Sequence, residues 1–423
     1  MFPVHDLMEK LFPICRSLTG DGVRETLAII GEQIPLSVHE VPSGTQCFDW
    51  TVPDEWNIRD AYVKDGNGNR LVDFRKNNLH VLGYSEPVEG EFTLDELQGH
   101  LFTHPDLSHA IPYLTSYYAP RWGFCLSQDQ LNAMGPGPYQ VKIDSTLRPG
   151  SLTYADLLIP GDSEQEILLS TYVCHPSMAN NELSGPAVTT ELVKWLQSLT
   201  RRRYSYRIVF APETLGAICY LFRNFETMKR NTIAGYVITC VGGPGRPTYI
   251  QTRQSDALVD RISAHVLAHC DEDANVLSYA HRGSDERQYG SPGVDLPVGS
   301  LARTLHGDFP EYHSSLDNLE FVTEAQLEKS LALYKKCITA IEANIKYRVK
   351  TTCEPQLGKR GLYPTLGSDP STTEKMAVTT ALIGYCDGTY DLLKIAEAHG
   401  WPVWALYDTV NTFVDHGLLE AAS

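Results

Sequence analysis

The middle of the chain alternates two hydrophobic patterns. Short runs of consecutive apolar residues are typical of strands buried on both faces, and longer segments with an apolar residue every three or four positions are typical of helices. The strand-like runs are residues 155–159, 166–173, 206–211 and 233–241. The helical segments are residues 183–199, 215–225, 256–269 and 323–346. This alternation predicts a doubly wound, mostly parallel α/β sheet covered by helices on both faces.

Outside this core the pattern changes twice. Turn-forming and aromatic residues are frequent in residues 48–139, and the apolar segments there are short, which predicts a β-rich inserted domain. Residues 370–423 contain three short helical segments with Gly-containing turns, the pattern of a small winged-helix domain. Residues 351–369 have little periodicity and are interpreted as a linker. The α/β domain is then formed by residues 1–47 and 140–348.

Composition narrows the class of protein. The chain is 42% hydrophobic and 21% charged, as in an ordinary globular protein, and no apolar run reaches the roughly 20 residues of a membrane helix. Residues 1–18 have acidic residues inside an apolar stretch and no small-residue cleavage site, which indicates an amphipathic first helix rather than a signal peptide. The ten cysteines form no CxxC pair, which suits reduced thiols. We therefore expect a soluble, cytoplasmic protein with no membrane partner.

Charge argues against a nucleic acid partner. The formal net charge is −17, whereas phosphate binding requires clustered Lys and Arg. From residue 351 onward there are four basic and nine acidic residues, and residues 402–415 contain no Lys or Arg. The winged helix is therefore expected to be a packing or dimerisation module in a homo-oligomer, with Trp401, Trp404 and Tyr407 as exposed contacts.

Polar residues follow the carboxyl ends of the predicted strands, where open α/β sheets place their active sites. After the strand at residues 166–173, His175 is followed by Asn181 and Glu182. A single histidine at such a position is more often structural than a metal ligand. The crowding of polar groups around it nevertheless favours a metal site.

Three later segments add candidate chemistry. Glu213 directly follows an apolar strand, where an unpaired carboxylate would be costly, so it is interpreted as a general base or as a cap of the next helix. Asp285 lies at the centre of a polar loop. His313 precedes the last long helix of the core, and Asp317, four residues later, is placed to orient a ligating imidazole.

Together and in this order, these clusters resemble the zinc aminopeptidase family M28, whose catalytic domain is a doubly wound α/β sheet. More narrowly, residues 174–185 (CHPSMANNELSG) are similar to the signature of a bacterial aminopeptidase-like subgroup of unknown function, with a β-rich inserted domain and a C-terminal winged helix. The residues that match the M28 motifs are His175, Ser184, Gly185, Glu213, Ser284, Asp285, Tyr312, His313 and Asp317.

The chain departs from the M28 pattern at three positions. Asn181 stands where a carboxylate bridges two zinc ions, Thr214 where a second Glu binds metal, and Cys240 where an Asp ligand would be. An amide and a hydroxyl are poor ligands for two cations, so the usual two-metal site is disfavoured. Cys240 could supply a thiolate, although its apolar strand favours burial.

The resemblance and these departures lead to one hypothesis. One zinc ion is bound by His175, Glu182 and His313, with a fourth position open for water. Glu213 takes a proton from that water as it attacks an amide or peptide bond in a small peptide or an amide-containing small molecule. Substrate contacts are assigned to Asp285, Asn181 and Tyr312, and the orientation of His313 to Asp317. Two alternatives stay open: a metal-free peptidase-fold module for binding or assembly, and a winged-helix regulator.

Overall fold

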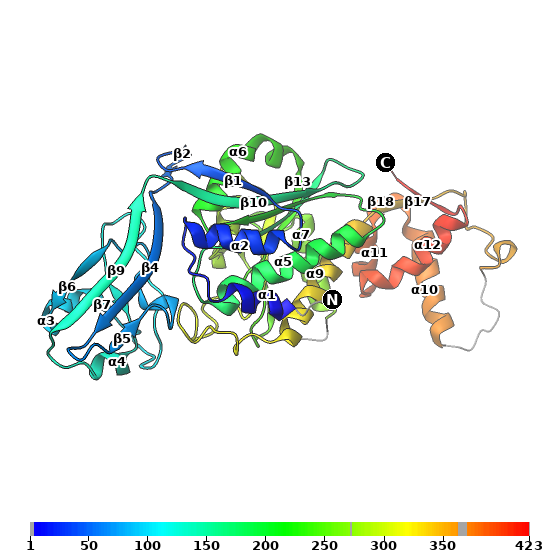
Figure 1. Ribbon diagram of the computed structural model, residues 1–423. Coiled ribbons are helices and arrows are strands. Elements are labelled where there is room, and N and C mark those ends of the chain that lie inside the picture. Colours follow the sequence, from blue (N-terminus) through cyan, green and yellow to red (C-terminus); the bar gives the residue numbers. More distant parts are fainter. Residues whose placement is uncertain (1–3, 271–272, 363–369, 423) are drawn as a thin grey trace. The chain divides into compact units, whose positions relative to one another are not determined.

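The computed structural model describes residues 4–270, 273–362 and 370–422. The chain divides into two compact units (Figure 1). The first comprises Met1–Asp260 and Glu272–Ala332, and the second comprises Arg261–Asp271 and Leu333–Ser423. Residues 363–369 of the predicted linker lie outside the described residues.

An eight-stranded sheet forms the centre of the first unit. Its order is β1 (Ser37–Pro42), β10 (Ser151–Ile159), β12 (Ser205–Ala211), β11 (Glu166–Tyr172), β13 (Thr232–Val237), β16 (Val298–Arg303), β14 (Pro247–Ile250) and β15 (Asn275–Leu277). Four of its seven pairings are parallel. The prediction of a mostly parallel α/β sheet is therefore confirmed.

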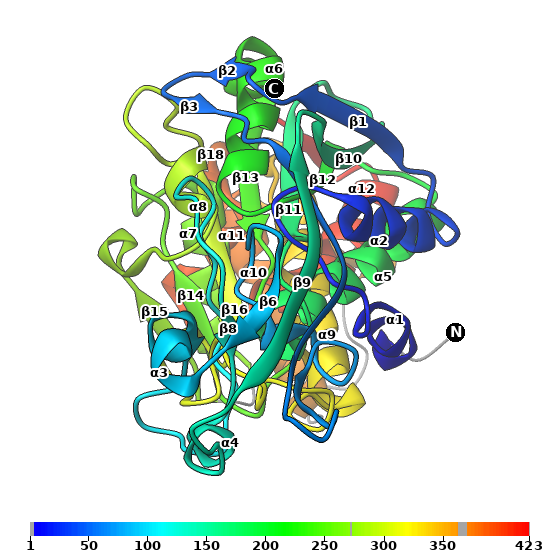
Figure 2. The same cartoon turned by 60° about the vertical axis from the view of Figure 1, so that its left-hand side comes forward.

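The chain reverses its direction across the sheet at β11. From β11 it moves to β12 through α5 (Ser184–Ser198), and from β12 it returns past β11 to β13 through α6 (Leu215–Asn231). Because both crossovers between parallel strands are right-handed by rule, the two helices lie on opposite faces of the sheet (Figures 1 and 2). Such a reversal opens a crevice at the carboxyl ends of the strands.

The first helix and one core strand end earlier than predicted, because the backbone at the following residues cannot continue them. The first helix ends early, at α1 (Val4–Leu11), because Pro13 disfavours helix at the residue before it, and α2 (Asp21–Gly31) follows. The strand predicted for residues 233–241 stops at Val237, and Cys240 has a positive φ of 52° that no strand accommodates. Two further helices are α7 (Leu258–Ala268) and α9 (Glu324–Ala343).

The inserted segment forms its own antiparallel sheet. Its strand order is β5 (Arg70–Asp73), β4 (Glu55–Lys64), β9 (Tyr139–Arg148) and β6 (Val88–Phe92). β9 begins at the predicted boundary and pairs with β4 and β6, so the inserted sheet extends past residue 140 (Figure 1). Shorter elements complete this part: β2 (Gln46–Cys47), β3 (Trp50–Thr51), α3 (Leu94–Leu97), β7 (Leu101–Phe102), β8 (Phe124–Cys125) and α4 (Gln128–Asn132).

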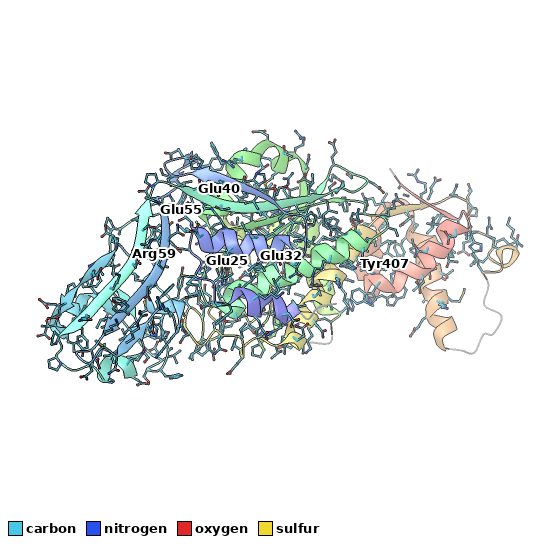
Figure 3. All side chains as sticks on the ribbon, in the orientation of Figure 1. Glu25, Glu32, Glu40, Glu55, Arg59 and Tyr407 are labelled. Atoms are coloured by element: carbon cyan, nitrogen blue, oxygen red, sulfur yellow. The ribbon has the colours of Figure 1, made fainter. Side chains whose placement is uncertain are left out.

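Arg24 of α2 connects the core to the inserted sheet. Its Nη1 and Nη2 donate to the two carboxylate oxygens of Glu55 at 2.8 and 2.6 Å, and its Nε donates to Glu40 of β1 at 2.8 Å. Glu40 and Glu55 are labelled in Figure 3. The guanidinium beside Glu55 lowers the pKa of that carboxyl to about 2, which marks a strong two-point contact.

The second unit is built on a three-stranded antiparallel sheet. Its order is β18 (Asp387–Asp391), β17 (Lys346–Val349) and β19 (Leu419–Ala421), with helices α10 (Pro370–Tyr385), α11 (Leu392–His399) and α12 (Tyr407–Asp415). Three helices and a small antiparallel sheet are the elements of a winged helix, as predicted. β17 precedes the predicted domain start at residue 370. No described helix combines the length and the apolarity that crossing a membrane requires.

The aromatic residues expected on the surface of the winged helix are half-buried instead. Trp404 packs edge-on against His269, with ring centroids 6.2 Å apart, and Trp401 stacks on His399 at 4.5 Å. Tyr407 is half-buried as well. Within this unit these side chains serve its own packing, so the prediction of exposed contacts is wrong.

Candidate functional site

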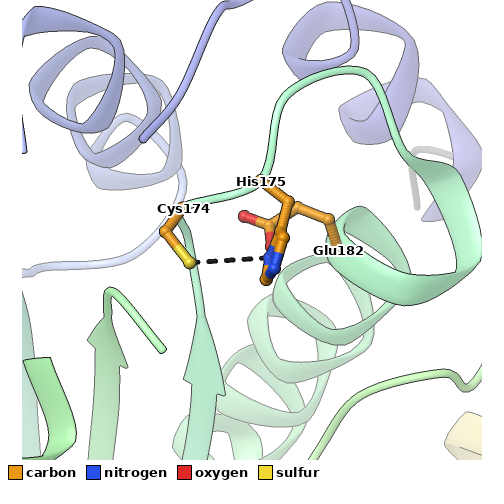
Figure 4. Close-up of side chains that lie close together, drawn as sticks. All are labelled: Cys174, His175 and Glu182. Atoms are coloured by element: carbon orange, nitrogen blue, oxygen red, sulfur yellow. Dashed lines mark hydrogen bonds and ion pairs between the residues drawn. The ribbon is translucent and has the colours of Figure 1, made fainter. Parts of the chain in front are cut away.

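His175 lies in the loop after β11, with its ring held by Glu182. Its Nδ1 donates to Glu182 Oε2 at 2.8 Å, and both side chains are buried (Figure 4). Glu182 belongs to one π-helical turn, Ala179–Leu183, that leads into α5. Such turns occur frequently at functional sites. Burial alone would lower the pKa of His175, but the Cys174 thiol and the Glu182 carboxylate raise it well above its usual value.

Arg16 stands behind Glu182. Its Nε lies 3.6 Å from Glu182 Oε1, and the exposed fraction of both side chains is 0%. The same guanidinium donates to the backbone carbonyls of His175 at 3.0 Å and Leu11 at 2.7 Å. Glu182 is thus placed between a cation and an imidazole N–H. This is the arrangement of a carboxylate that orients a ligating histidine, and it differs from the predicted role of Glu182 as a metal ligand.

Glu213 follows β12 and faces His175 from the other side. Its Oε2 lies 3.6 Å from His175 Nε2. Thr214, the next residue, has φ 63° and ψ −77°, and the Leu215 N–H donates to the Glu213 carbonyl at 2.7 Å. These are the features of a classic γ-turn, a rare and strained conformation. Strain of this kind clusters at functional sites, and burial also raises the pKa of Glu213.

Asp285 stabilises this turn. Its carboxylate accepts the Thr214 N–H at 2.7 Å, and its exposed fraction is 1%. Burial, and next the charge of Glu213, raise the pKa of Asp285 well above its usual range. Asp285 was predicted to contact the substrate. In the structure it contacts the backbone beside Glu213 and does not line the pocket described below, so its observed role is to position the turn.

His313 brings a second imidazole to the same place. Its ring centroid is 5.4 Å from that of His175, and the Tyr113 ring packs edge-on against both imidazoles at 5.2 Å. Tyr312, a predicted substrate contact, stacks on His313 at 3.9 Å. Burial, and next the charge of His175, lower the pKa of His313 to about 3, so its imidazole is neutral at neutral pH. His313 Nε2 is buried and has no hydrogen-bond partner among the described residues.

Asp317 does not hold His313, contrary to the prediction. Its carboxylate accepts the backbone N–H groups of Asn180 at 2.6 Å and Asn181 at 2.9 Å. No hydrogen bond joins it to His313 in the part of the chain that the structure describes. Asp317 therefore caps the π-helical turn that carries Glu182, and the prediction failed because the competing partners are backbone groups that a sequence pattern does not reveal.

Asn181 and Cys240 are buried next to each other, with Asn181 Nδ2 3.9 Å from Cys240 Sγ. Asn181 Nδ2 donates to the Tyr172 hydroxyl at 2.8 Å, while Asn181 Oδ1 is buried and has no partner among the described residues. Burial raises the pKa of Cys240 to about 12, so at neutral pH it is a thiol rather than a thiolate. Burial therefore disfavours the thiolate form in which Cys240 would bind a metal.

Two sets of side chains could hold a cation. Cys174, His175 and Glu182 place potential ligand atoms within 4.8 Å of one another (Figure 4). These atoms already bond to one another, burial raises the pKa of Cys174 to about 11, and Arg16 repels a cation at Glu182. The second set consists of His175 and His313, whose rings lie 5.4 Å apart, with Asn181 Oδ1 as the candidate third ligand atom. Its two unpaired buried atoms, a neutral imidazole nitrogen and an amide oxygen, fit one metal ion better.

A pocket of about 460 Å³ opens beside these groups. Of the predicted site residues, His175, Glu213 and His313 line it. Much of the remaining wall comes from the inserted segment, whose Tyr113 N–H donates to the His313 carbonyl at 2.8 Å. The other lining residues are Leu18, Trp50, Tyr113, Leu114, Thr115, Tyr117, Tyr118, Thr214, Leu215 and Arg287.

Sequence reasoning missed three contributors to the site. Arg16 is the one charged residue of the apolar segment 11–18, and a charge in such a segment is costly to bury without a partner. Arg287 belongs to the polar loop that carries Asp285, and the sequence does not distinguish it from the other charged residues of that loop. Tyr113 had no local signal, because the inserted segment reaches the site through tertiary contacts alone.

Comparison with known proteins assigns the chain to a family. The model of a domain of unknown function, DUF4910, matches residues 5–344, and that of a winged helix-turn-helix matches residues 345–421. A Clostridium acetobutylicum protein, named for polysaccharide biosynthesis and for an aminopeptidase-like domain, is 48% identical over 94% of this chain and 91% of its own length. A crystal structure from the same organism, described as a peptidase, has a TM-score of 0.93 at 45% identity, over 99% of this chain and 96% of that one.

More distant structures share the fold alone. A Shewanella amazonensis M28 peptidase precursor has a TM-score of 0.59 at 13% identity, over 84% of this chain and 95% of its own. A Bacillus subtilis zinc aminopeptidase has a TM-score of 0.56 at 11% identity, over 80% and 94%. The fold is thus aminopeptidase-like, as the sequence motifs indicated. With its family model matched along most of its length, the chain belongs to the DUF4910 family and carries a C-terminal winged helix.

Proposed function

We propose that the chain is a metal-dependent hydrolase of an amide or peptide bond, and that His175, His313 and Asn181 hold one zinc ion. The observation that carries this proposal is His313 Nε2, a buried and unpaired nitrogen on a neutral imidazole 5.4 Å, ring to ring, from His175. An imidazole kept neutral and without a partner is in the state that metal binding requires, whereas His175, whose pKa is raised, would release a proton when the metal binds. The substrate class is a small peptide or an amide-containing small molecule, in keeping with a pocket of about 460 Å³.

The protein's own side chains supply the general base and hold the catalytic groups in position. Bound zinc supplies a Lewis acid that lowers the pKa of water and stabilises negative charge on the substrate oxygen. Glu213 accepts a proton from the attacking water and passes it to the leaving nitrogen. Burial raises the pKa of Glu213, which makes its carboxylate a better base. The γ-turn at Thr214 and the Asp285 carboxylate hold Glu213 in place, and Glu182 fixes the orientation of His175.

Metal analysis of the full-length protein tests the site. After incubation with zinc and desalting, we expect about one zinc ion per chain, as in a catalytic zinc site. His175→Ala and His313→Ala should each lower this content, while His281→Ala, a change at an exposed histidine, should leave it unchanged. No bound zinc under these conditions would favour the metal-free binding module. Asn181, Thr214 and Cys240, which stand where M28 enzymes have acidic ligands, are the residues that support that second candidate.

Glu213→Gln separates catalysis from metal binding. Against a panel of blocked and unblocked amino acid amides and dipeptides, this variant should retain zinc and lose turnover. Unchanged hydrolysis would exclude Glu213 as the base.

The homo-oligomeric state and the cytoplasmic location stay predictions. Light scattering of the purified chain tests the oligomer, and fractionation of the producing cells tests the location.

A further inference from the structure

We propose that Arg287 is a specificity residue that binds a carboxylate of the substrate, so that the preferred substrates are N-acyl amino acids. This inference rests on the proposed hydrolase function of the same pocket. It assigns to the pocket a substrate class defined by a negative charge close to the reacting bond.

The Arg287 side chain has hydrogen-bond donors that the protein does not use. Arg287 is exposed and lines the pocket together with Glu213. The one described hydrogen bond of its side chain runs from Nη2 to the Thr214 hydroxyl at 2.6 Å, and this side chain forms no ion pair with a carboxylate of the described residues. A guanidinium has five N–H donors in a planar fork. The donors that Thr214 does not use are available for a two-point contact with a carboxylate.

Thr214 holds the Arg287 guanidinium beside the proposed base. Thr214 directly follows Glu213, and its backbone is fixed by the γ-turn and by the Asp285 carboxylate. The anion-binding fork is therefore anchored one residue away from the proposed base. An N-acyl amino acid carries its carboxylate on the carbon next to the scissile nitrogen. Its negative charge therefore lies close to the bond on which Glu213 would act, in the pocket that Glu213 and Arg287 both line.

The charged residues of the pocket wall also favour a substrate carboxylate. Among the residues that line the pocket, Arg287 is the single Lys or Arg and Glu213 the single Asp or Glu. If Glu213 is the base, the lining offers no second carboxylate to bind a free ammonium group. The wall thus favours an acylated nitrogen and a free carboxylate over a free amino terminus. Trp50 and Tyr118, with exposed fractions of 40% and 56%, add aromatic surface for an apolar side chain.

Binding of two matched probes tests the inference without requiring turnover. N-acetyl-L-phenylalanine and N-acetyl-L-phenylalaninamide differ only in the carboxylate. In a Glu213→Gln background, calorimetric titration should show the acid binding about 10-fold more tightly than the amide, as expected for a charge-assisted contact. Adding Arg287→Met should reduce this ratio to below about 2-fold, and Arg287→Lys should give an intermediate ratio, because Lys keeps the charge without the fork.

Controls separate Arg287 from other causes. Arg282→Met changes an exposed arginine of the same loop that does not line the pocket, so it should leave the ratio unchanged. Each titration is repeated after zinc removal with a chelator, because a carboxylate could also bind the metal. An acid preference that persists in Arg287→Met, or acid and amide that bind equally or not at all, would overturn the inference.

The outcomes for the two proposals are distinguishable. Missing zinc or missing hydrolysis contradicts the proposed hydrolase, whereas the ratio of the two binding constants reports on Arg287 alone. Hydrolysis of amides with no preference for a carboxylate would leave the hydrolase in place and exclude Arg287 as its specificity residue.

Discussion

The guanidinium of Arg16 lies 3.6 Å from the carboxylate of Glu182, and neither side chain is exposed. Arg16 comes from the loop after α1 and Glu182 from the turn before α5, so the pair joins segments distant in sequence. A buried ion pair is expensive to desolvate and is weak grounds for a stability role by itself. Here the pair has a second consequence: it directs the other oxygen of Glu182 towards His175 Nδ1.

Removing the cation of this pair should be strongly destabilising. In Arg16→Met the Glu182 charge stays buried beside a single imidazole, and we expect the free energy of unfolding to fall by about 3–5 kcal/mol. Urea titration followed by circular dichroism measures this loss. Because the cost arises from the unpaired charge, the double variant Arg16→Met, Glu182→Gln should lose less than the sum of the single variants. Additive losses would show that the two side chains act independently.

The role of Glu182 can be decided by zinc affinity. If Glu182 orients His175, Glu182→Gln keeps an oxygen that can accept the Nδ1 hydrogen bond, and the affinity should fall by about 10- to 100-fold. A directly ligating Glu182 would instead make this variant lose zinc as completely as His313→Ala. Competition with a chromogenic chelator measures both. The matched control is Glu191→Gln, which changes a buried glutamate of the adjoining helix α5 that pairs with Lys194.

The contact between the core and the inserted sheet should depend on pH. The pKa of Glu55 in the folded protein is about 2, below its ordinary value of 4.5, chiefly because of the hydrogen bonds from Arg24. A carboxyl with a lowered pKa adds stability that is complete above pH 4.5 and is lost as the pH falls towards 2. Because the pair is partly solvated, we expect about 1 kcal/mol from it.

Arg24→Met tests this dependence. The variant should be less stable than the parent at pH 6 and should lose less stability than the parent between pH 4.5 and pH 3. Urea titrations at several pH values give both quantities. Arg59→Met, which removes the exposed ion pair with Asp144 on the inserted sheet, is the comparison that should change the profile little. Parallel curves for Arg24→Met and the parent would contradict the assignment to Glu55.

Local pattern explains what could be predicted from the sequence. The strand before His175 and the strand before Glu213 are continuous apolar runs, and burial on both faces requires such runs whatever the rest of the fold does. Since parallel strands end at one edge of a sheet, the residues that follow them could be expected together, and His175, Glu213 and His313 do line one pocket.

The partners of these residues could not be predicted in the same way. Arg16 reaches Glu182, and Asp317 reaches the backbone of Asn181, across more than a hundred residues of sequence. Such contacts depend on the packing of loops, which leaves no periodic signal. The γ-turn at Thr214 is also invisible in the sequence, because a β-branched residue is an unfavourable choice for a positive φ.

That turn yields a prediction about substrate selection. Thr214→Val keeps the size and the β-branching of the side chain, and therefore the backbone strain, but removes the hydroxyl that accepts from Arg287 at 2.6 Å. We expect the free energy of unfolding to change by less than about 1 kcal/mol, since the lost hydrogen bond is exposed. The preference for N-acetyl-L-phenylalanine over its amide should fall by about 3-fold or more, because the guanidinium is no longer fixed. Thr214→Ser retains the hydroxyl and should retain the preference. If the serine variant loses as much of it as the valine variant, the hydroxyl is not the anchor, and the position of Arg287 must be determined by the loop that carries it.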